Sequence, residues 1–328
     1  MKHYILFYTY DTHGLDMMKP VFDLVNNHPD YEATLLLANN TGEFGVWQDC
    51  HVKKEVRLGV QGKSFRLGGI LIDRKPTVAL GFRSWWNPDR VICNHARQLG
   101  VPTVMINHGA MFIHNKAQTY KVDMGGSLIN CIWGQHDLDM WRKWNTRNEF
   151  IITGNPLHDK LVNFVPEDLD VPEEFVLLLT PRGQRKYLNP SAEALNKIIP
   201  VIAKCHPIDD QKQYYKDRYQ TFIEPETLLP LLFKAKFIIT NVTSALIPAL
   251  LWEKPIFIHS YDMNGYDFSS FESKYSDVFN FKRTIEWTDD LLNNPIVPKK
   301  EHYYLFGHIP DGNNSSRVFE VIETYANK

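Results

Sequence analysis

Two side chains that could bind an anion follow one apolar run in the second half of the sequence. Residues 201–206 read Val-Ile-Ala-Lys-Cys-His and are followed by a proline. Because proline cannot extend a sheet ladder, the strand ends there, and strand alternation turns Lys204 and His206 to the same side. A cation and an imidazole at the end of a buried strand are poorly placed for packing. The pattern therefore predicts a ligand site at this strand end.

Other strand ends of the second half carry polar side chains as well. They contribute Thr180 and Arg182 after one apolar run, Glu224 and Glu226 after another, and Asn241, Thr243 and Ser244 after a third. Hydroxyls at the start of a helix lie beside free backbone N–H groups, which favour a phosphate. The alternative is that Thr243 and Ser244 only cap the helix. Together with Arg182, Lys204 and His206, they predict a diphosphate site at one sheet edge.

The sequence also indicates how the phosphate charge would be met. Neither GxGxxG nor GxxxxGK[ST] occurs, and no DxD pair follows a strand. These absences argue against dinucleotide oxidoreductases, P-loop NTPases and a metal-bridged diphosphate. We expect no metal and no cofactor, with Arg, Lys, His and helix N-termini facing the phosphates.

Two histidines of the first half are candidates for a general base. His108 ends the run 104–108 and precedes a glycine, and His13 follows the first strand together with Asp11. An imidazole, with its pKa near neutrality, suits the deprotonation of a hydroxyl. Structural histidines that cap turns are the alternative, and the sequence does not choose between His13 and His108.

Residues 50–100 are strongly basic. They hold ten Lys and Arg against three acidic residues, a net charge of +7 in a chain whose overall charge is −2. This stretch is either a solvated face or a surface for an anionic partner. Its candidate partner-binding residues are Lys53, Lys54, Arg57, Arg66, Arg83 and Trp85. Trp85 could belong to the core or stack on a sugar or base.

The elements that position these residues alternate between apolar strands and helix-like segments. In the first half, short β-rich runs are expected at 90–100, 102–110 and 128–134. Such alternation predicts parallel sheets covered on both faces, with ligands beyond the carboxyl ends of the strands. The fold class is therefore α/β, with two doubly wound, Rossmann-like domains. The connector at 153–175 carries three prolines, and we place the boundary near residue 165, giving domains 1–165 and 166–310.

Composition describes a globular cytoplasmic protein. The chain has 328 residues, of which 44% are hydrophobic and 23% charged. Its four cysteines are far apart and show no zinc spacing, so we expect reduced thiols in a cytosolic setting. No apolar run approaches the ~20 residues that cross a bilayer, and the first residues are expected to form a strand.

The chain resembles the two-domain GT-B glycosyltransferases, in particular the CDP-glycerol glycerophosphotransferases and related wall- and capsule-polymer transferases. More distantly it is similar to UDP-N-acetylglucosamine 2-epimerases. The matching segments, in the order of the family, are INHGA (106–110), ITGNPLHDKL (152–161), AKCHP (203–207), TNVTSALIPALLWEKP (240–255) and DGNNSSRV (311–318).

The resemblance implies facing domains with a cleft between them, and a C-terminal helix (311–328) that returns to the first domain. It implies that His206, Thr243 and Ser244 bind the phosphates of a UDP- or CDP-type donor, with Arg182 assisting, and that His108 is the base. The expected reaction is an inverting, metal-independent transfer of a sugar or polyol phosphate to a hydroxyl. The acceptor would be an anionic polymer, either DNA with a hydroxylated base or a wall or capsule polymer.

Two residues depart from the family pattern. Asn241 stands where the family has aspartate, and Pro248 stands where an acid commonly contacts the donor. We therefore expect a transferred group that differs from the usual one. A CDP-glycerol transferase, a sugar-nucleotide 2-epimerase and a non-catalytic nucleotide-sugar binder remain alternatives. The epimerase ranks lower because residues 240–248 lack its paired glutamates.

Overall fold

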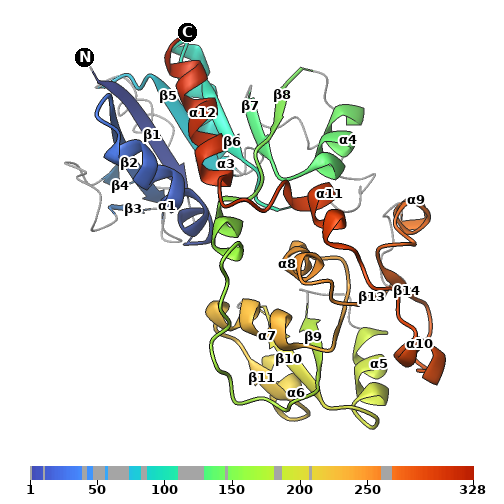
Figure 1. Cartoon of the computed structure of the whole chain (residues 1–328). Helices are drawn as coiled ribbons and strands as arrows, with labels where there is room; N and C mark the ends of the chain where they lie inside the picture. Colours follow the sequence, from blue (N-terminus) through green and yellow to red (C-terminus); the bar gives the residue numbers. More distant parts are fainter. Residues whose placement is uncertain are drawn as a thin grey trace. The chain divides into compact units, whose positions relative to one another are not determined.

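The computed structural model describes residues 2–9, 12–38, 43–46, 56–57, 74–82, 87–109, 129–144, 147–180, 187–206, 209–259 and 268–328. The chain forms two compact units. Unit 1 comprises the described residues of Met1–Ala110 and Gln118–Val162 together with Gly307–Lys328, and unit 2 comprises the described residues of Asn163–Phe306. The last helix of the chain thus belongs to the same unit as the first strand (Figure 1).

Unit 1 is built on an eight-stranded sheet in the order β4-β3-β2-β1-β5-β6-β7-β8. Its strands are β1 (His3–Thr9), β2 (Tyr31–Ala38), β3 (Glu43–Val46), β4 (Val56–Arg57), β5 (Val78–Phe82), β6 (Thr103–Ile106), β7 (Ile129–Ile132) and β8 (Glu149–Ile152). Its helical segments are α1 (Thr12–Asn27), α3 (Asn87–Gln98), α4 (Gln135–Trp144), η2 (Pro156–Leu161) and α12 (Asn314–Ala326). The pairs from β2 to β8 are parallel, whereas β3 and β4 add an antiparallel extension that the sequence did not suggest.

One element of unit 1 differs from its prediction. Residues 90–100 were expected to be β-rich but lie largely in helix α3. The buried Cys93 and Ala96 are three residues apart, which is the spacing of one helix face. The helix ends at Gln98, and Gly100, two residues later, has a positive φ of 66° that suits glycine. The strand prediction failed because a short stretch with adjacent valine and isoleucine does not by itself distinguish a strand from a helix.

Unit 2 is built on a six-stranded sheet in the order β11-β10-β9-β12-β13-β14, with every pair parallel. Its strands are β9 (Val176–Thr180), β10 (Val201–Cys205), β11 (Gln220–Phe222), β12 (Phe237–Thr240), β13 (Ile256–His259) and β14 (Asn280–Lys282). Its helical segments are α5 (Leu188–Leu195), α6 (Lys212–Lys216), η3 (Pro225–Thr227), α7 (Leu228–Lys234), η4 (Ser244–Leu246), α8 (Ile247–Leu251), α9 (Phe268–Lys274), α10 (Asp289–Asn293), η5 (Lys300–His302) and α11 (Tyr303–Gly307).

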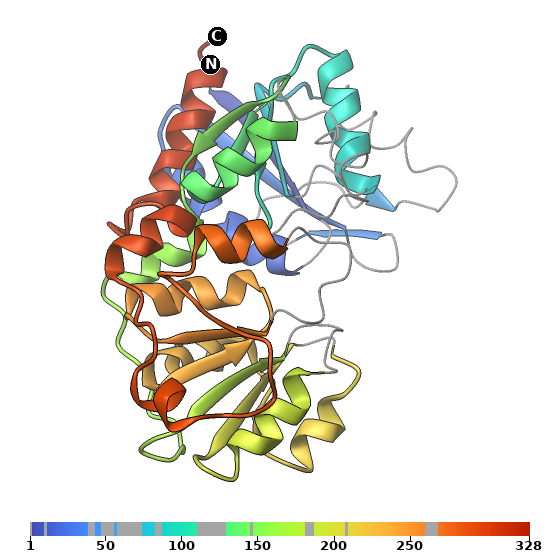
Figure 2. The ribbon, with the colours of Figure 1, turned by 90° about the vertical axis from the view of Figure 1, so that its right-hand side faces the viewer.

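The central strands of unit 2 are buried along their whole length. All residues of β9, β10, β12 and β13 are buried, which requires cover on both faces of the sheet. On one face, side chains of α5 and Tyr215 pack against Leu178, Ala203 and Ile239. The views in Figures 1 and 2 show helices flanking this sheet. These buried strands therefore fix the positions of the residues that directly follow them.

Helix α12 packs on the opening elements of the chain. The Phe319 ring lies edge-on to His28 and Tyr31, with ring centroids 5.6 and 5.3 Å apart. Figures 1 and 2 both show α12 beside the N-terminal elements of unit 1. The last residues of the sequence are therefore part of the core packing of unit 1.

Three of the four cysteines fall in the described part of the chain. Cys93, Cys131 and Cys205 are free and buried. Burial raises the pKa of the Cys131 thiol to about 12, so this thiol stays protonated and packs as a small apolar group. No helix in the described segments has the length and apolar character required to cross a membrane.

Candidate functional site

The two histidines proposed as general bases lie side by side in unit 1. His13 is the second residue of α1, and His108 follows the end of β6 by two residues. Their ring centroids are 5.2 Å apart with the planes at 79°. Phe82, the last residue of β5, contacts both, at 5.6 Å from His13 and 5.3 Å from His108. Three adjacent parallel strands thus end beside one pair of imidazoles.

Gly14 explains how α1 comes so close to the strand ends. A Cβ at this position would lie 2.1 Å from Thr9 Oγ1 and 2.5 Å from Phe82 Cδ1. Neither atom belongs to a long, flexible side chain, so a larger residue would displace the helix start. The glycine after His13 therefore allows the start of α1 to pack closely against Thr9 and Phe82, next to the edge-on contact between His13 and Phe82.

Several residues named from the sequence fall outside the described residues. They are Asp11, Lys53, Lys54, Arg66, Arg83, Trp85 and Arg182. Arg57 lies in strand β4, which pairs with β3, and only its backbone is described. The assignment of these residues to a partner or a donor stays a prediction.

In unit 2, Lys204 is bound by main-chain oxygens. Its ammonium donates to the carbonyls of Cys205, at 3.2 Å, and Ile223, at 3.0 Å, and the side chain is buried. Burial lowers the pKa of Lys204, while Glu224 and Glu226 act in the opposite direction. Glu226 itself is exposed in η3. Lys204 therefore contributes a buried positive charge at the end of β10, and its direct contact with a donor stays a prediction.

His206 is exposed directly after β10, next to a hydrogen-bonded cluster at the end of β9. The Asp209 N–H donates to the His206 carbonyl at 2.9 Å. The Asp209 carboxylate accepts a hydrogen bond from Thr180 Oγ1 at 3.0 Å. Thr180, expected to bind the donor, is buried and directs its hydroxyl at this carboxylate. Asp209 was missed because nothing in the sequence distinguishes it from Asp210.

The loop after β12 shows the capping interaction that was the alternative to phosphate binding. Thr243 has an extended backbone, and its hydroxyl accepts a hydrogen bond from the Ala245 N–H at 3.4 Å. Its hydroxyl hydrogen remains available to a ligand oxygen. Ser244 is half-buried, and Asn241 is buried directly after the strand. Capping and ligand binding are thus compatible for Thr243.

Five strand ends form one polar row across the unit 2 sheet, here called the strand-end row: Cys205, Thr180, Asn241, His259 and Lys282. Cys205 pairs in register with Thr180, and His259 with Lys282. The register of Thr240 with Ile258, extended by one residue, places Asn241 beside His259. Residues in register on parallel strands share a face, so the row lies along one edge of one face.

His259 and Lys282 of this row were not identified from the sequence. Both are buried, and among the described residues neither ring nitrogen of His259 has a hydrogen-bond partner. Burial, with the charge of Lys282, lowers the pKa of His259 to about 4. Burial lowers the pKa of Lys282 to about 8, and its ammonium lies 4.2 Å from the Trp287 ring centroid. The sequence did contain a pattern that could have identified His259: residues 255–259 form an apolar run that ends on a histidine, as residues 201–206 do.

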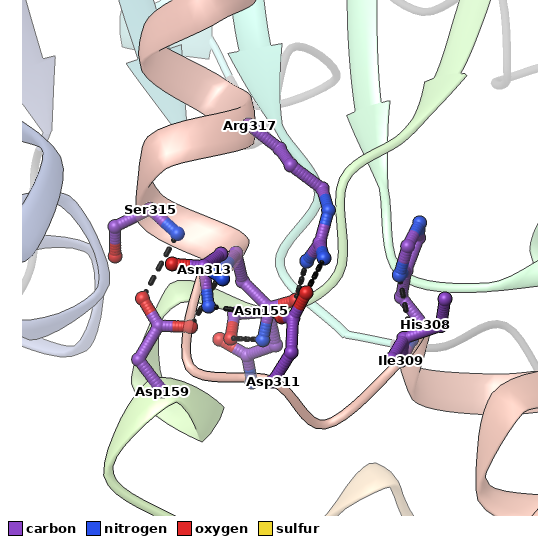
Figure 3. Close-up of polar contacts among 9 residues, drawn as sticks. Asn155, Asp159, His308, Ile309, Asp311, Asn313, Ser315 and Arg317 are labelled. Carbon is purple, nitrogen blue, oxygen red and sulfur yellow. Dashed lines mark hydrogen bonds and ion pairs between the residues drawn. The ribbon is translucent and has the colours of Figure 1, made fainter. Parts of the chain in front are cut away.

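Two of the segments that carry the family resemblance meet at the start of α12 (Figure 3). Asp159 accepts hydrogen bonds from the backbone N–H groups of Asn314, at 2.7 Å, and Ser315, at 2.9 Å. The Asn314 amide donates to the Asn155 carbonyl at 3.0 Å. Gly154 has a φ of 80°, and a Cβ there would lie 2.1 Å from Asn314 Oδ1. Residues 153–161 and 311–318 therefore form an anchor for the C-terminal helix.

The described residues contain no group of three or more His, Cys, Asp or Glu side chains arranged to hold a metal ion. The groups near the described strand ends of unit 2 that could attract an anion include the imidazole of His206, the hydroxyls of Thr243 and Ser244, and the ammonium groups of Lys204 and Lys282.

Comparison with known proteins establishes the fold. No family model matches the sequence, and no curated protein matches it. Among solved structures, the S. aureus MnaA–UDP co-structure matches with a TM-score of 0.70 and 13% identity, covering 100% of this chain and 97% of that one. UDP-GlcNAc 2-epimerase from Neisseria meningitidis bound to UDP-GlcNAc matches with a TM-score of 0.63 and 14% identity, covering 99% and 100%. Acinetobacter baumannii MurG matches with a TM-score of 0.55 and 11% identity, covering 99% and 100%. The chain therefore has the GT-B fold of two Rossmann-like domains.

Proposed function

We propose that the chain is a GT-B glycosyltransferase that uses a nucleoside diphosphate donor of the UDP or CDP type. The observation that carries the proposal is the set of polar strand ends in unit 2, in a chain whose whole length matches the MnaA–UDP co-structure. The UDP-GlcNAc in the Neisseria structure supports a sugar nucleotide as the donor. The CDP-glycerol branch suggested by the sequence motifs makes a polyol phosphate the alternative transferred group.

Donor binding is assigned to the carboxyl edge of the unit 2 sheet. The exposed imidazole of His206 and the hydroxyls of Thr243 and Ser244 are the groups proposed to meet the diphosphate oxygens, joined by Arg182. Lys204 adds a buried positive charge near the end of β10, where its ammonium donates hydrogen bonds to the Cys205 and Ile223 carbonyls. The diphosphate is thereby neutralised by side chains, and no metal is required by the proposal.

Acceptor activation is assigned to the pair of imidazoles in unit 1. A ring nitrogen of His108 or His13 takes the proton of the acceptor hydroxyl as the oxygen attacks the sugar carbon. The bond from that carbon to the phosphate oxygen breaks, and the nucleoside diphosphate leaves with the electron pair. Attack opposite to the leaving group inverts the configuration at carbon. With a CDP-polyol, attack would be at phosphorus and the nucleoside monophosphate would leave.

An anionic polymer is the proposed acceptor. The support is the net charge of +7 over residues 50–100, which is suited to a polyphosphate chain. DNA with a hydroxylated base and a wall or capsule polymer share this chemistry. Salt-titrated binding to duplex and single-stranded DNA distinguishes them, since a DNA acceptor predicts affinity that falls steeply with salt.

A sugar-nucleotide 2-epimerase is the second candidate, because epimerases such as the one from Neisseria meningitidis match the chain from end to end. An epimerase changes the configuration of the donor sugar and needs no acceptor. It would yield an isomerised nucleotide sugar with no free nucleotide, whereas a transferase releases UDP or CDP.

The test is incubation of the protein with UDP-, CDP- and GDP-activated sugars and polyols, with and without DNA and teichoic-type polymers. Released nucleotide and donor isomers are measured by chromatography, and an EDTA arm tests the independence from metal. We expect His206→Ala to weaken nucleotide binding, and His108→Ala to keep binding and lose transfer. His95→Ala, on helix α3, is the matched control. Full turnover in both His13→Ala and His108→Ala would refute the base assignment.

A further inference from the structure

A buried carboxylate, that of Asp209, lies close in sequence to the exposed His206 and contacts the end of β9. Asp209 is only 5% exposed, although it lies three residues after a surface histidine. Carboxylates are rarely buried, because the charge loses its hydration, and a buried one needs hydrogen-bond donors. Among the described residues, two donors to Asp209 are Thr180 Oγ1, which donates to Oδ2 at 3.0 Å, and the Gln211 N–H, which donates to Oδ1 at 2.8 Å.

The same residue also holds the main chain of His206. The Asp209 N–H donates to the His206 carbonyl at 2.9 Å. Asp209 therefore fixes the His206 backbone with its own N–H while its carboxylate holds the neighbouring strand. A shift of the His206 backbone away from β9 would break at least one of these bonds.

The anchor on the other side is the end of β9. Thr180 is the last residue of that strand and pairs in register with Cys205, which immediately precedes His206. The Cys205 thiol is hydrogen-bonded to Thr180, and both side chains are buried. A continuous chain of buried polar contacts thus runs from Cys205 through Thr180 to Asp209.

We propose that Asp209 is a positioning residue of the nucleotide site, which holds the His206 loop against β9 so that the imidazole lies where the diphosphate binds. The proposal rests on the proposed function for the role of His206. It assigns Thr180 to the support of this loop, through its hydrogen bond to Asp209, and it predicts that both residues act on ligands through His206.

The test measures binding of UDP and CDP by calorimetry. Outer-shell partners of this kind change ligand affinity by about 10–100-fold where they have been removed from metal sites, and we expect a loss of that order for Asp209→Ala. Thr180→Val keeps the side-chain shape and removes the hydroxyl, and it should weaken binding in the same direction. Asp217→Asn is the matched control, since Asp217 is an exposed acid after α6 that accepts from Gln213, and it should change affinity less than about twofold.

A double-mutant cycle separates positioning from a general loss of structure. In the His206→Ala background, Asp209→Ala should cause no further loss of UDP or CDP affinity, because the residue through which it acts is gone. Additive losses would overturn the proposal, as would unchanged affinity in both Asp209→Ala and Thr180→Val. Thermal unfolding of each variant shows whether it is folded, and Asp209→Asn replaces Asp209→Ala if the latter is not.

Hydrogen exchange of the segment 205–212 distinguishes failure of this inference from failure of the proposed function. If the wild-type protein bound neither nucleotide, the proposed function and the ligand role of Asp209 would both fall. Faster exchange in Asp209→Ala would then still show that Asp209 anchors the loop. If the wild type binds nucleotide and Asp209→Ala changes neither affinity nor exchange, the proposed function stands and this inference is wrong.

Discussion

Removal of the Asp159 carboxylate should release the C-terminal helix from unit 1. Asp159 lies 155 and 156 residues before the two backbone N–H groups that it accepts from, those of Asn314 and Ser315. These N–H groups belong to the first turn of α12, where the helix itself offers no acceptor. Asn314 is fully buried and Ser315 nearly so, which means that water cannot easily replace the carboxylate.

The expected magnitude follows from these two contacts. A buried donor left without its partner costs about 1–3 kcal/mol, and loss of a charge at a helix N-terminus adds about 0.3–1 kcal/mol. With partial relaxation, Asp159→Ala should destabilise the docking of α12 by about 3 kcal/mol, within the range of large single-site effects. Asp159→Asn should lose roughly half as much, because its amide oxygen can still accept one of the two N–H groups.

Hydrogen exchange monitored by mass spectrometry measures this loss directly. An opening free energy lowered by about 3 kcal/mol corresponds to roughly hundredfold faster exchange of the α12 amides. Asp139→Ala is the control, because Asp139 is an exposed acid of the same unit that accepts from Gln135. It should leave α12 exchange unchanged. Equal protection of α12 in Asp159→Ala and the wild type would show that the carboxylate does not hold this helix.

Two further outcomes follow from the packing and from the buried histidine. Gly14→Ala should destabilise unit 1 by about 1–3 kcal/mol in urea unfolding, since its Cβ would meet Thr9 and Phe82, and stability equal to the wild type would contradict the close packing. Gly100→Ala, whose Cβ would meet nothing within 4 Å, should cost only the roughly 1 kcal/mol of its left-handed backbone. The pKa of His259 is lowered to about 4, so the unfolded chain binds the proton first and stability falls as the pH drops from about 6.5 towards 4. His259→Leu should reduce this fall by about 2–3 kcal/mol, measured as the unfolding free energy at pH 7 and 4.5, and an unchanged pH dependence would exclude His259 as its source.

The strands of unit 2 could be predicted because parallel strands buried on both faces read as continuous apolar runs. Residues 201–205 and 237–240 are such runs, and both proved to be central strands. The meeting of His13 and His108 follows from the same rule, since the carboxyl ends of adjacent parallel strands share one edge of the sheet. Short stretches of sequence can therefore predict which polar side chains meet, when those side chains follow adjacent parallel strands.

What the sequence could not give was the partner of each polar group. Lys204 lies in β10 and His206 directly after it, yet the ammonium is bound by two carbonyls while the imidazole is exposed. Asp209 and Asp210 are adjacent and chemically identical, yet the first is buried and accepts hydrogen bonds from Thr180 and the Gln211 N–H, whereas the second is exposed. Such differences depend on contacts between residues far apart in the chain, which local periodicity does not encode.

Two of the five segments that resemble the family form the anchor of α12, so their similarity indicates a structural role. Of the five matching segments, 152–161 and 311–318 supply the contacts between Asp159, Asn155 and the start of α12. In this chain these contacts hold the start of α12 within unit 1, and none of them involves a strand end of unit 2. Their presence therefore supports the fold without selecting a donor or an acceptor. The transferred group instead concerns Asn241, which follows β12, and Pro248, which lies in α8, the two positions that depart from the pattern expected from the resemblance. Because Asn241 and Pro248 supply no carboxylate at these two positions, the proposed donor would be recognised mainly through its diphosphate, and an assay of many nucleotide donors is more informative than a test of a single one.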